Sequence, residues 1–292
     1  MNADHGQTGE GLGVGLGGFV ADVVGGAVGH AAADAAAGHP EREAFVAVVA
    51  AAALSEALPL SEETVKLQRA KVGPDHPDTL SSMNNLAVAY EEAGRLSEAL
   101  PLLEETLKLR RVKLGPNHLN TLITKRNLAI AYEAAKKPAD AETLFRELAG
   151  GRWDKEGPGS VEAATARLEF ATFLYRQGRY PEAEALLGEW LPEFEKNLPE
   201  DWQRFWAESL LGSCLLKQKK ATEAEPLLLS GYAGMNQRQD KIPAASLGPL
   251  RDALQRLVNL YTALDQPEKT AEWKQKLAEF DQAPPIPKPK QP

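Results

Sequence analysis

A 42-residue internal repeat is the feature that most constrains the fold of this chain. The stretch SEALPLSEETVKLQRAKVGPDHPDTL begins at Ser55 and returns from Ser97 as SEALPLLEETLKLRRVKLGPNHLNTL. A second stretch, NNLAVAYEEAGRL from Asn84, returns at the same separation as RNLAIAYEAAKKP from Arg126. A fixed period of this length indicates a repeat architecture, in which each unit buries its apolar face against its neighbours.

In the units that contain Asn84 and Arg126, a Leu-Ala pair is followed by an aromatic residue four positions after the Leu and by an Ala thirteen positions after it, and fainter copies follow. These slots are filled, wholly or in part, by Leu86, Ala87, Tyr90 and Ala99; Leu128, Ala129, Tyr132 and Ala141; Phe170, Ala171 and Ala183; Leu211, Gly212 and Ala224; and Leu257, Tyr261 and Thr270. Apolar positions at helical spacing predict two amphipathic helices per unit. Small residues in the Ala slots allow the two helices to approach closely.

The breaks between these segments suit the turns of helical hairpins. Gly94 and Gly178 are suited to helix C-termini, and the Gly115-Pro116 pair is expected to end a helix. We expect Asp78 or Asn120 to cap the helix that follows each long loop. The loop histidines, His76 and His118, are expected to be structural and lie one repeat apart; metal ligation, catalysis and partner contact are the alternatives.

Composition excludes several classes of protein. The net charge of −8, with no concentrated run of basic residues, argues against nucleic-acid binding. Cys214 is the one cysteine, so neither a disulfide framework nor a thiolate metal cage is expected. The first Lys or Arg is Arg42, which argues against a secretory signal, and no apolar stretch is long enough to span a bilayer. A cytoplasmic location is therefore expected.

No constellation of residues predicts catalysis, a metal site or a cofactor. Residues 13–20 spell G-x-G-x-x-G-x-V, but no Lys follows until Lys66 and the other kinase motifs are missing. The same glycines lack the preceding strand of a dinucleotide fingerprint. We therefore expect this chain not to be an enzyme.

The stretch NNLAVAYEEAGRLSEALPLLEETLKLRRVKLGPNH resembles the tetratricopeptide repeats (TPRs) of the kinesin light chain and of many bacterial regulatory proteins. The resemblance is strongest from Leu54 to about Leu148 and continues in phase to about Phe280. It implies an all-α, right-handed superhelical solenoid of helix-turn-helix repeats that acts as a protein-interaction scaffold. In that family the first helix of each pair lines a concave face that binds a peptide.

Carried onto this chain, the resemblance assigns the amide that precedes the Leu-Ala pair, Asn85 or Asn127, to that groove. A side-chain amide both donates to and accepts from a peptide backbone, so it can hold a peptide without reading its sequence. The full set of expected groove residues is Asn84, Asn85, Val88, Arg126, Asn127 and Ile130. Arg126 suits an acidic ligand side chain. The alternative is that Asn85 and Asn127 only brace adjacent helices; later units carry Glu169 and Leu210 in their slot, which limits the amides to two units.

The predicted organisation has three parts. Residues 1–53 are a Gly/Ala-rich leader, either flexible or with a degenerate capping helix at 41–53. Residues 54–281 form the array: a half repeat at 54–78, then repeats at about 79–120, 121–157, 158–200, 201–245 and 246–281. Residues 282–292 form a Pro-rich tail, for which disorder is expected.

Two interpretations compete with an independent scaffold. Similar repeats are appended to bacterial serine/threonine kinases, where they recruit substrates, so the chain could be such a regulatory region. Uncapped end faces of a repeat array also favour self-association. All five tryptophans follow residue 150; they are expected to fill gaps between irregular repeats, although Trp202 and Trp206, four residues apart, could instead anchor a partner.

Overall fold

The computed structural model describes residues 40–157, 159–243 and 247–282. These residues form eleven α-helices and one short 3-10 helix, η1 (Gln239–Lys241), and include no strand. The helices α2 to α5 pack in chain order, and so do the helices α7 to α12. The prediction of an all-α fold is therefore confirmed. Among the described helices, none combines the length and the apolar character that a bilayer crossing requires.

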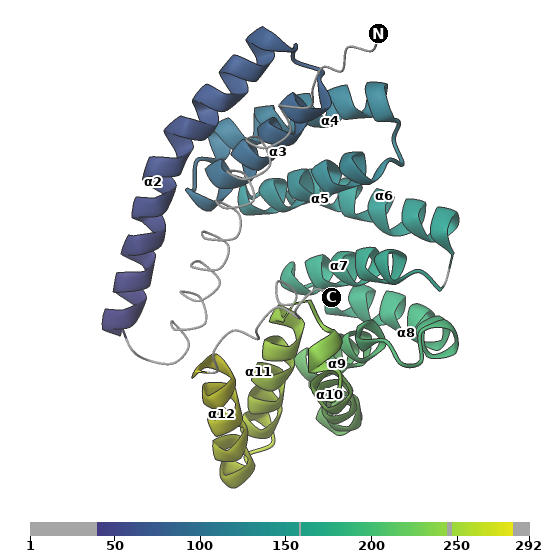
Figure 1. Cartoon of the computed structure of the whole chain (residues 1–292). Coiled ribbons are helices and arrows are strands. Elements are labelled where there is room, and N and C mark those ends of the chain that lie inside the picture. Colours follow the sequence, from purple (N-terminus) through teal and green to yellow (C-terminus); the bar gives the residue numbers. More distant parts are fainter. Residues whose placement is uncertain (1–39, 158, 244–246, 283–292) are drawn as a thin grey trace, which may run out of the picture. The chain divides into compact units, whose positions relative to one another are not determined.

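The chain divides into two compact units between Leu144 and Phe145, inside helix α6. Figure 1 labels the helices of both units. Unit 1 contains α2 (Pro40–Lys71), α3 (Pro77–Glu92), α4 (Leu96–Leu114), α5 (Leu119–Ala134) and the first part of α6 (Pro138–Glu156). Unit 2 contains the rest of α6, then α7 (Val161–Arg176), α8 (Tyr180–Asn197), α9 (Trp202–Lys217), α10 (Ala221–Asn236), η1, α11 (Gly248–Ala263) and α12 (Pro267–Gln282).

In both units most helices pack on the next one in the chain, and the first helices of neighbouring hairpins also touch. Helix α3 contacts α4 and α5 in unit 1. In unit 2, α9 contacts α7 and α11 as well as α8 and α10. Because first helices contact one another directly, residues one repeat apart are brought onto adjacent helices.

Small residues lie buried where the repeat pattern expects them. Ala87, Ala129 and Ala171 are completely buried, as are the second-slot residues Ala99, Ala141, Ala183 and Ala224. A larger side chain in these slots has no space to occupy unless the packed helices move apart.

The turn inside each hairpin needs a left-handed backbone at one position. Gly94 and Gly178 fill this position with φ of 72° and 76°. The equivalent residues Lys136, Lys219 and Asp265 also have positive φ, of 58°, 65° and 53°. In the first hairpin the N–H groups of Gly94 and Arg95 donate to Glu91 O and Tyr90 O, and equivalent bonds recur in the others. This pattern closes the last turn of the helix and reverses the chain.

The long loops end in histidine caps, not in the Asp and Asn caps that we predicted. His76 and His118 occupy the N-cap positions of α3 and α5. The Nδ1 atom of His76 accepts from Asp78 N–H at 3.3 Å, and that of His118 accepts from Asn120 N–H at 3.2 Å. Asp78 and Asn120 are wrong as caps because they lie inside the first turn and contribute the N–H that is capped. The repeated histidines therefore satisfy helix ends.

Helix α2 runs without a break from Pro40 to Lys71. We expected a capping helix at 41–53 and a separate helix from Ser55; both segments lie in this one helix. The residues at their junction, four alanines followed by Leu54, favour helix and include no Gly that would turn the chain. The end-cap role remains a prediction, and the rest of the leader and the tail from residue 283 lie outside the described residues.

A tyrosine-to-glutamate hydrogen bond joins successive hairpins. Tyr90 Oη donates to Glu62 at 2.8 Å, and Tyr132 Oη donates to Glu104 at 2.8 Å. In unit 2, Tyr261 Oη donates to Glu225 at 3.0 Å. Burial, together with the adjacent glutamate, raises the pKa of each of these three phenols from 10.0 to about 12.

These tyrosines make the fold sensitive to alkali. Because the folded pKa lies above the unfolded value, their stabilisation is complete below pH 10 and is lost as the pH rises toward about 12. An absorbance titration of phenolate should show Tyr90, Tyr132 and Tyr261 ionising late, with the urea midpoint falling over the same range. Tyr132→Phe should remove one late-ionising group. Loss of an early-ionising group in that variant would contradict the assignment.

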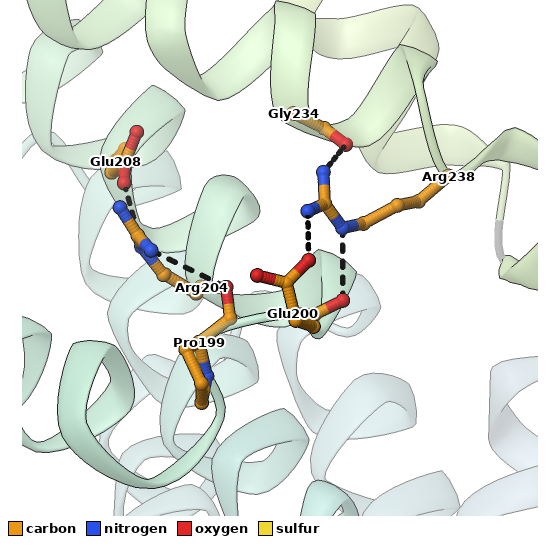
Figure 2. Close-up of polar contacts among 6 residues, drawn as sticks. All are labelled: Pro199, Glu200, Arg204, Glu208, Gly234 and Arg238. Atoms are coloured by element: carbon orange, nitrogen blue, oxygen red, sulfur yellow. Dashed lines mark hydrogen bonds and ion pairs between the residues drawn. The ribbon is translucent and has the colours of Figure 1, made fainter.

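In unit 2 the end of α10 is tied to the loop that precedes α9 (Figure 2). Arg238 donates from Nε to Glu200 O at 2.9 Å and from Nη1 to Gly234 O at 3.2 Å, and it pairs with the Glu200 carboxylate. Its guanidinium carbon lies 4.5 Å from the centre of the Phe205 ring, and that of Arg204 lies 4.9 Å from the same ring. This arrangement holds Phe205 between α9 and α10.

Candidate functional site

The predicted groove residues lie on two helices in contact, α3 and α5 of unit 1. Five of the six retain accessible surface and define what we call the α3–α5 face. Asn85 and Arg126 are exposed, whereas Val88, Asn127 and Ile130 are half-buried. They occupy these positions because a helix turns about 100° per residue, which places residues three positions apart on neighbouring parts of its surface.

Asn84, the sixth predicted residue, is buried and is only 6% exposed. Its Oδ1 accepts from Asn127 Nδ2 at 3.2 Å and from Thr124 Oγ1 at 3.1 Å. These two bonds join α3 to α5 beneath the face. Asn84 and Asn127 therefore brace the helices, and Asn127 also retains surface on the α3–α5 face.

A buried arginine on α4 extends this polar network. Arg110 Nη1 donates to Thr124 Oγ1 at 2.7 Å and to Asn120 O at 2.8 Å. Its Nη2 lies 3.3 Å from Ser81 Oγ on α3. The sequence pattern does not indicate this role for Arg110, because an arginine near a helix C-terminus is ordinarily a solvated surface charge.

Charges of both signs lie at the end of α3. Burial raises the pKa of Glu91, the charge of Glu92 raises it further, and Arg126 opposes them. Arg126 is thus close enough to Glu91 to influence its charge across the two helices. The α3–α5 face offers amide, apolar and charged groups within one pair of helices.

The other hairpins do not continue this combination. The slot of Asn85 is taken by half-buried Glu169 on α7, by fully buried Leu210 on α9 and by Arg256 on α11. Arg256 is 6% exposed and donates from Nη1 to Ser209 Oγ at 3.0 Å. In the sequence, only the repeat register marks Arg256 as the residue that occupies the Asn85 slot on α11.

Other residues that could carry chemistry are buried in unit 2. Trp202 and Trp206 stack with their ring centres 5.6 Å apart and are each 8% exposed, so they fill space between helices. Burial raises the pKa of the Cys214 thiol to about 12, which disfavours the reactive thiolate. Within the described ranges, no three side chains of His, Cys, Asp or Glu gather as metal ligands.

Together, the hairpins and the α3–α5 face define a helical repeat protein with a composite surface on adjacent first helices. Models of the tetratricopeptide repeat family match residues 50–111, 93–149 and 126–197. The chain belongs to the tetratricopeptide repeat family. Members of this family generally mediate protein–protein interaction and are typically non-catalytic.

Solved structures of kinesin-light-chain-like proteins are similar to the chain. A kinesin-light-chain-type chain of nearly identical TPR-like repeats from Podosopora anserina is 25% identical, with a TM-score of 0.58, over 64% of this chain and 90% of that one. BtubC (BKLC) from P. vanneervenii is 15% identical, with a TM-score of 0.59, over 82% of this chain and 97% of that one. The latter likeness shows the fold alone. No curated protein matches the sequence.

Proposed function

We propose that the chain is an interaction scaffold whose α3–α5 face binds an extended segment of a partner protein. Asn85 and Asn127 contact the backbone of that segment, because each amide offers both a donor and an acceptor. Val88 and Ile130 provide apolar contacts, and Arg126 pairs with an acidic side chain of the partner. Such a partner segment needs little more than an extended backbone with an acidic residue near one end.

One observation supports this proposal: Asn85 and Asn127 occupy the same repeat position on helices that touch, and both residues retain accessible surface. Asn85 is exposed, so bracing does not account for its position. Asn127 Nδ2 is already held by Asn84, which orients its side chain before a ligand arrives. Orienting a polar group in advance lowers the entropic cost of binding.

Single variants separate binding from bracing. With the chain as bait in a lysate of its source cells, Asn85→Ala should reduce recovery of groove-bound partners by about fivefold without changing the urea midpoint, since one hydrogen bond is lost. Asn127→Ala should reduce both recovery and stability, because it also removes the bond to Asn84. The double variant should lose most recovery.

The matched control is Asn236→Ala with Asn259→Ala, which removes two exposed amides from unit 2. This control should retain every partner that the wild type retains. Equal recovery of the same partners by wild type, control and Asn85→Ala would show that the α3–α5 face is not the binding surface.

A further inference from the structure

A small cavity lies at the loop edge of unit 1, apart from the α3–α5 face. It has a volume of about 210 Å³ and is lined by the start of α3, the end of α4 and the start of α5. Its lining residues are Pro77, Leu80, Arg110, Lys113, Leu114, His118 and Asn120. None of them is acidic, although the chain as a whole carries a net charge of −8.

Arg110 is the unusual member of this lining. Its side chain is only 4% exposed, and the partners described above are neutral oxygens. Buried cations are normally paired with a carboxylate, because desolvation of an unpaired charge is costly. In the described part of the chain, no acid contributes to the pKa of Arg110, which burial alone lowers.

The neighbouring repeats carry different residues, with different charge pairing, at the position of Arg110. The equivalent residue one repeat earlier is the neutral Gln68, and one repeat later it is Arg152, which lies 3.7 Å from Glu156. Placement of a cation at the end of a helix does not account for Arg110, because such cations are usually solvated. The positive charge of Arg110 is thus buried without the compensation seen in the next repeat.

Two further groups bring positive charge or donors to the cavity. The Lys113 side chain is 40% exposed, and its Nζ pairs with Asp75 at 2.8 Å. His118 accepts from Asn120 N–H through Nδ1, so its proton is on Nε2, which is left as a donor. The first turn of α5 adds the positive end of a helix dipole.

We propose that this cavity binds a phosphate group through Arg110, Lys113 and His118. The cavity is smaller than a typical pocket for a drug-sized ligand, which favours a compact group. A phosphate carries nearly two negative charges and several acceptor oxygens, so it matches convergent arginine, lysine and histidine donors better than a single carboxylate does. The phosphate is either free in solution or part of a phosphorylated side chain of a partner. This site does not depend on the proposed groove, since Asn85 and Asn127 do not line it.

Calorimetric titration of the whole chain with inorganic phosphate at constant ionic strength tests this proposal. The wild type should bind in a saturable manner, and Arg110→Gln should bind at least about tenfold more weakly, because charge-assisted hydrogen bonds are lost. Glutamine already occupies this position one repeat earlier, as Gln68. Lys113→Gln changes an exposed residue and should also weaken binding, which keeps the test decisive if Arg110→Gln fails to fold.

Arg111→Gln is the charge-matched control, because Arg111 adjoins Arg110 in sequence but is exposed and does not line the cavity. It should bind phosphate like the wild type. A second arm adds a short phosphoserine peptide and its unphosphorylated form: competition by the phosphopeptide alone identifies a phosphorylated side chain as ligand, and lack of competition identifies free phosphate. Absence of saturable phosphate binding, or equal affinity in the wild type, Arg110→Gln and Lys113→Gln, would overturn the proposal.

Discussion

Replacement of Gly231 by alanine is expected to lower the free energy of unfolding by about 3 kcal/mol or more. A Cβ atom at Gly231 would lie 2.6 Å from Ser209 N and 2.7 Å from Phe205 O. Both atoms belong to the backbone of α9, so no side-chain rotation relieves the contact. The helices α9 and α10 must therefore move apart, and their packed core is lost. Urea unfolding followed by circular dichroism measures the change.

Two other glycines provide graded controls. Gly188 lies inside α8, and a Cβ atom there would meet nothing within 4 Å. Gly188→Ala should therefore stabilise the protein by about 0.5–1 kcal/mol, because alanine favours helix. A Cβ atom at Gly212 would lie 2.8 Å from Leu228 Cγ and 3.1 Å from the backbone atom Ala224 O, which is less close than the backbone contacts of Gly231, so Gly212→Ala should have an intermediate effect. Similar losses for Gly231→Ala and Gly188→Ala would contradict the close approach of α9 and α10.

Ala129→Leu is expected to destabilise unit 1 by about 1–3 kcal/mol. Ala129 is completely buried and occupies the small-residue slot of its repeat. Leucine has nearly the same helix propensity as alanine, so the loss reports overpacking rather than a weaker helix. Denaturant unfolding of the variant gives the size of the effect.

The matched variant is Ala134→Leu, at the exposed end of the same helix. Its stability should stay within about 0.5 kcal/mol of the wild type, as for most surface substitutions. A neutral result for Ala129→Leu would show that the repeat slot does not mark a close helix contact.

The hairpin pattern was predictable because it depends on the local spacing of apolar and small residues along the sequence. The left-handed turn residues show the limit of this approach. Gly94 and Gly178 were identified, whereas Lys136, Lys219 and Asp265 adopt the same backbone without a glycine to indicate it. Register alone locates them, since each is followed by the start of the next helix in its repeat.

The candidate site was only partly predictable. Asn84 and Asn85 are adjacent in sequence, yet Asn84 is buried against α5 and Asn85 is exposed. One step along a helix rotates a side chain by about 100°, so the fate of each amide depends on where the neighbouring helix lies. The close packing at Gly231 and Gly234 was also not predictable from the sequence. The space that a side chain would need there is filled by the backbone of α9 and by the Phe205 ring, which belong to another helix.

The sequence by itself determined the period, the paired helices, the small-residue slots and the family, because each depends on residue spacing within one repeat. Only the tertiary structure decided that histidines cap α3 and α5, that Arg110 is buried without an acidic partner in the described residues, and that Trp202 and Trp206 pack inside unit 2. Burial and pairing are set by groups from different repeats that meet in space. The periodicity of the sequence does not specify these contacts between repeats.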